Sequence, residues 1–174
     1  MVLIGWIIII VALTVMDQVT KLMAANLLTD GKSFDVISGV LRFTYVENRG
    51  AAFGMFSEHR WVFMTLSVVA IVALLIYLWK FRTDSKLACL AMSMIIAGGI
   101  GNMIDRVVLG YVIDFLDFCA FPKIWPWVFN VADVCVCVGG GLLVLWLILS
   151  IISDYKKEKA EKSADSSAQN NNTK

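Results

Sequence analysis

The sequence predicts an all-α integral membrane protein with four transmembrane helices and a small extracytoplasmic β-sheet. Hydrophobic residues make up 59% of the chain. Charged residues make up 17%, whereas an ordinary soluble domain has about a quarter. Four apolar stretches qualify as membrane spans, which need about 20 residues, and a short alternating segment lies between the first two. The length of 174 residues allows one compact domain.

The four apolar stretches are Val2 to Leu22, Trp61 to Trp79, Leu87 to Ile104, and Phe129 to Ile152. The first resembles a signal peptide in its position. It lacks a basic segment before the apolar run, however, and the run is longer than a typical signal core. We therefore expect it to be a retained helix.

Lysine and arginine in the short connections predict the orientation of the helices. The segment "KFRTDSK" joins the second and third stretches, and "YKKEKAEK" follows the fourth. Such basic segments favour the cytoplasmic side, which places both termini in the cytoplasm. The membrane domain should cover residues 1–155, with outer segments at about 23–60 and 105–128. Residues 156–174 form a polar tail that we expect to be disordered.

The first outer segment contains a strand signal. In "LRFTYV", Leu41, Phe43 and Tyr45 alternate with polar or smaller residues, as in a strand with one apolar face. Ser38 and Gly39 could form a turn before it. We expect a small sheet resting on the outer surface of the membrane.

Composition argues against two other classes of function. A net charge of +1 gives no reason to expect nucleic acid as a partner. The only histidine is His59, and Cys135 and Cys137 have one residue between them, which is not a zinc spacing. We therefore expect neither a metal nor another cofactor.

Ionisable residues lie at the ends of the apolar stretches, where they are costly and usually pair. Asp17 and Lys21 are four residues apart, in the favourable acid-first order on one helical face. They form either an ion pair that orients the helix or part of a reaction centre. Asn48, in "ENRGAAFG", either belongs to a turn or reaches into the mouth of the bundle.

The third stretch ends in "GGIGNMIDRVV". Its glycines let a helix or a ligand approach closely, and helix packing alone would also explain them. Asn102, Asp105 and Arg106 share one helical face. We expect Arg106 to neutralise Asp105, in which case that aspartate is a poor proton shuttle.

Two further aspartates have different surroundings. Asp114 lies between Ile113 and Phe115, and an apolar setting raises a carboxyl pKa toward the range of an acid–base catalyst. It could instead be a strand-end or turn residue exposed to water, and Asp117 is a competitor. Asn130 is placed to cap the fourth helix, with Asp133 in its first turn, which could be plain capping. Two facing carboxylates could also share a proton and activate water.

Five segments taken together resemble the lipoprotein signal peptidases, the bacterial type II signal peptidase family. They occur in the order "DQVTK", "ENRGAAFG", "GGIGNMIDR", "GYVIDF" and "FNVAD", and the match covers nearly all the chain except the polar tail. The resemblance implies a membrane aspartic endopeptidase that cuts a lipoprotein precursor before a cysteine carrying diacylglycerol. It also implies that Asp114 and Asp133 are the catalytic pair.

The resemblance assigns the other polar residues to support of the site or the substrate. These residues are Asp17, Lys21, Asn48, Gly98, Asn102, Asp105, Arg106 and Asn130. It further implies contact with membrane lipid, inhibition by the cyclic peptide globomycin, and a place in the bacterial cytoplasmic (inner) membrane with the site near the outer surface. Arg49 stands where many relatives have threonine. The alternative function is a small transporter or proton-relay bundle, which would also place carboxylates within its helices.

Overall fold

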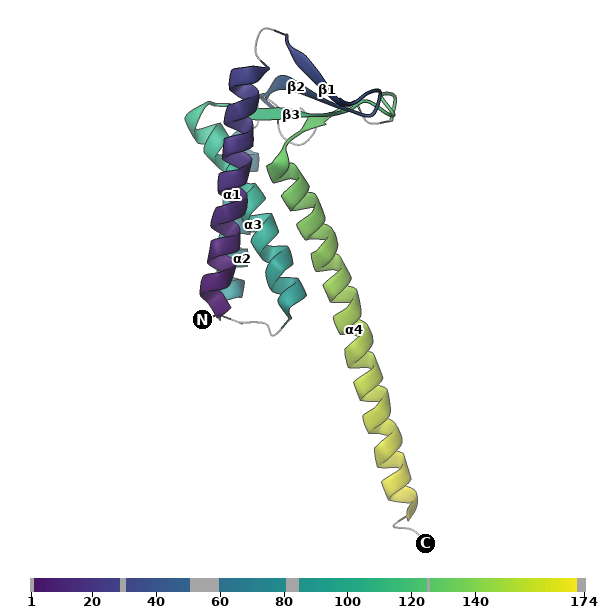
Figure 1. Cartoon of the computed structure of the whole chain (residues 1–174). Helices are drawn as coiled ribbons and strands as arrows, with labels where there is room; N and C mark the ends of the chain where they lie inside the picture. Colours follow the sequence, from purple (N-terminus) through teal and green to yellow (C-terminus); the bar gives the residue numbers. More distant parts are fainter. Residues whose placement is uncertain (1, 29–30, 51–59, 81–84, 125, 172–174) are drawn as a thin grey trace.

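A computed structural model describes residues 2–28, 31–50, 60–80, 85–124 and 126–171. Within these residues the chain forms four helices and four strands (Figure 1). The helices are α1 (Val2–Leu27), α2 (Arg60–Lys80), α3 (Lys86–Val108) and α4 (Val131–Asn171). The strands are β1 (Ser33–Ile37), β2 (Leu41–Asn48), β3 (Val112–Phe118) and β4 (Val128–Phe129). The predicted fold class is confirmed.

Three of the helices in the described part of the chain have the length and composition of membrane-spanning segments. Among the described residues, Leu3–Leu27, Lys86–Val108 and Val131–Lys162 are long and apolar enough to cross a membrane. Helix α2, 21 residues long, adds the shorter apolar stretch Met64–Lys80. Large apolar side chains on these helices face outward, and Ile4, for example, is 62% exposed. Such a surface suits contact with lipid rather than with water.

Helix α3 is the central helix and packs against the three others. Its small residues allow this, because a Cβ at Gly98 would overlap the main-chain carbonyl of Ala132 in α4. A Cβ at Gly99 would lie 2.9 Å from Cδ1 of Ile71 in α2. The packing explanation for the glycines of the third apolar stretch is therefore correct at both positions.

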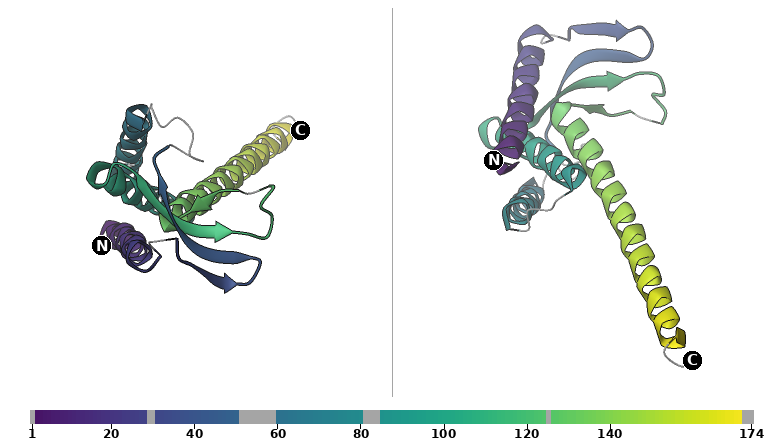
Figure 2. Two further views of the ribbon diagram at one scale, coloured as in Figure 1. Left: turned by 90° about the horizontal axis from the view of Figure 1, so that it is seen from above. Right: turned by 60° about the horizontal axis from the view of Figure 1, so that its bottom comes forward.

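The strands form one antiparallel sheet in the order β1-β2-β3-β4. The strand expected at residues 41–46 is present as β2, and the turn at Ser38 and Gly39 connects it to β1. Gly39 has φ +70, which glycine adopts without steric cost. The sheet lies across one end of the helix bundle and projects to one side of it (Figures 1 and 2).

Two boundaries differ from the sequence predictions. The fourth helix begins at Val131 rather than Phe129, because Phe129 belongs to β4. At the other end, residues 156–171, expected to be disordered, continue α4 as helix. Lysine, glutamate and alanine there favour helix, and the preceding turns remove the cost of nucleation. The exposed pair Glu158 and Lys162, four residues apart, adds further support.

The two ends of the bundle have different chemistry. The beginning of α1, the end of α2 and the beginning of α3 lie at the end of the bundle away from the sheet (Figure 1). By sequence, α2 ends at Lys80 and α3 begins at Lys86. Residues 81–84 of the basic "KFRTDSK" segment lie outside the described residues, as do residues 51–54 of "ENRGAAFG". The sheet covers the opposite end, where the polar residues gather.

Candidate active site

Asp114 and Asp133 are brought together where the sheet meets the helices. Asp114 is in the middle of β3 and is 2% exposed, so it is not the water-exposed turn residue that the sequence left open. Asp133 is in the first turn of α4 and is half-buried. Asn130, fully buried between β4 and α4, contacts both.

Asn130 and Asp133 form a reciprocal cap at the start of α4. The Asp133 N–H donates to Asn130 Oδ1 over 2.9 Å, and the Asn130 N–H donates to Asp133 Oδ2 over 3.1 Å. This arrangement satisfies two main-chain donors, as a capping box does. Asn130 also donates its side-chain amide to Asp114 Oδ1 at 2.6 Å. The predicted capping role is confirmed, and the same residue joins the two aspartates.

Each of the two aspartates accepts a further hydrogen bond from a side-chain amide of another element. Asn48, at the end of β2, donates to Asp114 Oδ2 over 2.9 Å. Asn102, from α3, donates to Asp133 Oδ1 over 2.8 Å. Asn48 Oδ1 also accepts the Gly50 N–H at 3.0 Å, so both alternatives for Asn48, turn residue and bundle residue, hold.

A buried ion-pair cluster lies close to the two aspartates. Lys21 Nζ is 2.9 Å from Asp17 Oδ2, as the spacing of four residues predicted, and 3.0 Å from Asp105 Oδ2. The prediction that Arg106 neutralises Asp105 is wrong, because Asp105 is paired with Lys21. Neighbouring residues on a helix point apart, and Arg106 turns back to donate to the carbonyl of Asn102 over 3.2 Å.

Sequence reasoning missed Gln18. Its amide donates to Asp105 Oδ1 over 2.9 Å and to the carbonyl of Gly101 over 3.1 Å. A signal was present, because Thr14, Asp17, Gln18 and Lys21 recur at the spacing of one helical face. Polar residues at that spacing in an apolar helix indicate a face turned toward the bundle interior.

Burial is the main influence on the acidity of Asp114. It raises the pKa of this carboxyl, and the negative charge of Asp133 raises it further, to about 7. The amides of Asn48 and Asn130 act in the opposite direction, since they stabilise the carboxylate. Two neighbouring carboxyls of this kind can hold one proton between them, which suits general acid–base catalysis of water attack.

Asp117, the competitor of Asp114, lies elsewhere. It faces Arg42, whose Nε donates to Asp117 Oδ2 over 3.1 Å, and the two residues are paired across β2 and β3. Asp114 is paired with Val46 in the same ladder. The structure thus brings Asp114, and not Asp117, to Asp133.

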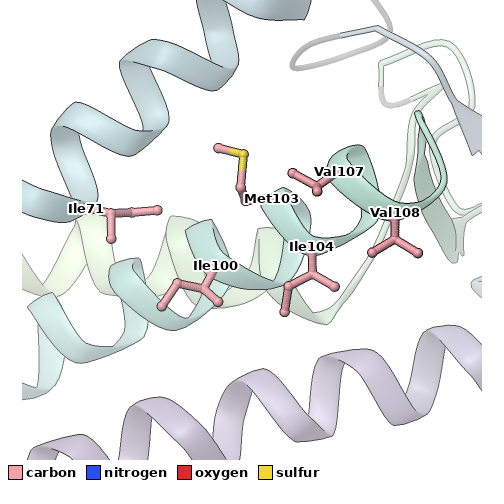
Figure 3. A pocket seen from close by; sticks show the side chains of 6 residues that line it. All are labelled: Ile71, Ile100, Met103, Ile104, Val107 and Val108. Atoms are coloured by element: carbon pink, nitrogen blue, oxygen red, sulfur yellow. The ribbon is translucent and has the colours of Figure 1, made fainter.

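An apolar groove of about 260 Å³ lies between α2 and α3 (Figure 3). It is lined by Ile71, Ile100, Met103, Ile104, Val107 and Val108. Asn102 and Asp105, from the same helix, belong to the polar network instead. In the described part of the chain, no group of three or more His, Cys, Asp or Glu could hold a metal ion.

Comparisons with known proteins identify the family. The model of a family described as Signal peptidase (SPase) II matches residues 9–149. The chain belongs to the signal peptidase II family. This match includes all the residues of the polar network described above.

Similar proteins and structures agree with this family. A lipoprotein signal peptidase of Halothermothrix orenii is 43% identical over 140 residues, 80% of this chain and 92% of that protein. One of Clostridium tetani is 42% identical over 142 residues, covering 82% and 91%. A solved structure described as a bacterial membrane enzyme has a TM-score of 0.78 and 34% identity over 84% of this chain and 89% of that chain. Another has a TM-score of 0.74 and 35% identity, covering 82% and 92%.

Membership of the signal peptidase II family agrees with the resemblance seen in the sequence motifs. The alternative of a transporter or proton-relay bundle is not supported, because the relatives named above are signal peptidases. A multi-pass membrane protein is also supported, by the apolar helices and the similar membrane enzymes.

Proposed function

We propose that this chain removes signal peptides from diacylglyceryl-modified lipoprotein precursors, with Asp114 and Asp133 as the catalytic pair. The activity is supported by the membership of this chain in the signal peptidase II family. The observation that supports the pair is the geometry of Asn130, which contacts both carboxyls at the junction of β3 and α4. Aspartic chemistry needs two such carboxyls with different proton occupancy.

The proposed mechanism uses one protonated and one ionised aspartate. Asp133, half-buried and therefore open to water and substrate, takes a proton from a water molecule that attacks the scissile carbonyl. Asp114, protonated because its pKa is raised to about 7, donates a hydrogen bond to the carbonyl oxygen and later helps to protonate the leaving amine. The amides of Asn48 and Asn102 hold the two carboxyls in place.

The orientation in the membrane follows from the charges at the two ends of the bundle. Lys80 and Lys86 favour the cytoplasmic side, and the sheet and site then face outward. We place the chain in the bacterial cytoplasmic (inner) membrane, with both termini in the cytoplasm. Diacylglyceryl chains of the substrate would then enter sideways from the lipid, near the outer surface.

The decisive experiment incubates the purified protein with a synthetic precursor that carries diacylglycerol on its cysteine. Cleavage should occur immediately before the modified cysteine, and the same peptide without lipid is the matched control. Globomycin should inhibit the reaction. Failure to cut the lipidated precursor, with the protein folded in detergent or bilayer, would contradict the proposal.

Cleavage should decrease as the pH rises through about 7. The mechanism needs protonated Asp114, and a raised pKa keeps it protonated below that value and ionises it above. Asn48→Ala removes an amide that lowers the pKa of Asp114. In this variant the loss of activity on the alkaline side of the pH profile should therefore move to higher pH. The pH dependence of kcat/KM reports the free enzyme's ionisations and measures both effects. An alkaline limb that stays in place in Asn48→Ala would show that Asn48 does not act on the acid.

Removing the residues after Lys162 should leave cleavage unchanged. This segment is the end of α4 farthest from Asp133, and the bundle and the sheet lie at the other end (Figure 1). The truncated and full-length proteins should have equal kcat and KM in a purified assay. A lower kcat for a correctly inserted truncated protein would assign the tail a direct part in the reaction.

A further inference from the structure

A buried carboxyl anchors the main chain immediately before Asp114. Asp105 Oδ2 accepts the Ile113 N–H over 3.1 Å, and Ile113 is the residue that precedes Asp114 in β3. Asp105 is 3% exposed and comes from α3. The strand that carries Asp114 is therefore fixed to α3 one residue away from the proposed acid.

A second buried carboxyl anchors the main chain immediately before Asp133. Asp17 Oδ1 accepts the Ala132 N–H over 2.8 Å, and Ala132 is the residue that precedes Asp133 in α4. Asp17 is 1% exposed and comes from α1. The two proposed catalytic aspartates thus have matching anchors, each one a buried aspartate bonded to the preceding N–H.

Lys21 and Gln18 join these two anchors to each other. Lys21 Nζ bonds both carboxylates, at 2.9 Å to Asp17 and 3.0 Å to Asp105. Its third hydrogen bond, 2.9 Å long, goes to Asn102 Oδ1. The Gln18 amide bonds Asp105 Oδ1 at 2.9 Å and lies 3.3 Å from Asp17 Oδ2. One continuous set of hydrogen bonds therefore runs from the residue before Asp114 to the residue before Asp133.

We name this set the buried link. It consists of the side chains of Asp17, Gln18, Lys21 and Asp105. We propose that the buried link sets the distance between Asp114 and Asp133, so that its members are positioning residues for the reaction. This inference rests on the proposed function, and it assigns Gln18 a part in the reaction.

The energetics favour a positioning role over a purely stabilising one. Two carboxylates and one ammonium, each at most 3% exposed, carry a desolvation cost that often exceeds their attraction. Well-packed apolar residues would often stabilise the same volume better. What such groups supply is directed hydrogen bonds at fixed lengths. Misplacing a catalytic group by about 1 Å can cost about 10²-fold in rate, so fixed lengths matter here.

The test is Gln18→Leu, which removes the hydrogen bonds from the Gln18 amide to Asp17 and Asp105 without changing any charge. We expect kcat to fall about 10-fold to 10²-fold with KM nearly unchanged, because geometry and not substrate contact is lost. The charged groups facing the pair stay in place: Asp17, Lys21, Asp105 and Arg106. A change in the separation of the two apparent pKa values of the pair would then report a changed distance between the carboxyls.

Thr14→Val is the matched control. Thr14 lies on the same face of α1 and donates to the carbonyl of Ala97 in α3 over 3.4 Å, and among the described residues no hydrogen bond joins it to Asp17 or Asp105. This variant should keep the wild-type kcat and pH profile. If Gln18→Leu behaves like Thr14→Val, or raises KM alone, the positioning role is overturned.

Infrared titration of the carboxyl groups, with Asp114→Asn as the reference for band assignment, separates this inference from the proposed function. If the wild-type protein does not cut the lipidated precursor, the proposed function fails. The titration of the pair in Gln18→Leu still measures the carboxyl coupling. Coupling equal to wild type overturns the buried link, and a changed coupling supports it.

Discussion

Asp114→Asn and Asp133→Asn should each reduce cleavage by about 10³-fold or more while leaving the protein folded and inserted. Each change keeps the size of the side chain and removes one proton-transfer group, whose contribution lies in this range. Each asparagine retains an oxygen that can accept one of the amide bonds now made to the aspartate. Initial rates on the lipidated precursor, normalised to folded protein, measure the loss.

Two further variants make this result specific. Asp117→Asn, at the Arg42 end of β3, should keep most of the activity. The double variant Asp114→Asn with Asp133→Asn should be little worse than either single variant, because residues that act as a unit are not additive. Near wild-type cleavage by either single variant would remove that residue from the pair.

Gly98→Ala should both destabilise the protein and impair cleavage. The added Cβ would overlap the Ala132 carbonyl and lie 2.8 Å from Val136 Cγ2, so α4 must move away from α3. Overpacking of this kind costs about 1–3 kcal/mol. Because Ala132 precedes Asp133, the movement also displaces the proposed base, and kcat should fall by about 10²-fold.

Gly140→Ala is the control for the Gly98→Ala variant. It introduces the same methyl group at a position in α4 where, apart from the adjacent residues and the local helix backbone, no heavy atom lies within 4 Å of the added Cβ. Thermal unfolding in detergent should therefore show a lower midpoint for Gly98→Ala and an equal or higher one for Gly140→Ala. Equal midpoints and equal kcat for the two variants would show that α3 and α4 do not pack through Gly98.

The sequence by itself determined the features that depend on short-range geometry. Runs of apolar residues predict helices that cross a membrane, because the bilayer sets their length. The pair of Asp17 and Lys21 follows from the pitch of the helix, which brings residues four apart to one face. The cap at Asn130 and Asp133 likewise spans three residues, and the alternation that indicates β2 is local.

Only the tertiary structure decided which distant groups meet. Asp105 pairs with Lys21, 84 positions earlier, rather than with its neighbour Arg106. Asn48 reaches Asp114 because β2 and β3 pair with a register that shifts between Phe43 and Val46, and the mostly apolar sequence of β3 does not reveal that register. Gln18 contacts Asp105 for the same kind of reason: the packing of α1 on α3 selects its partners. Long-range contacts depend on how whole elements pack, and the spacing of residues along one element does not contain that information.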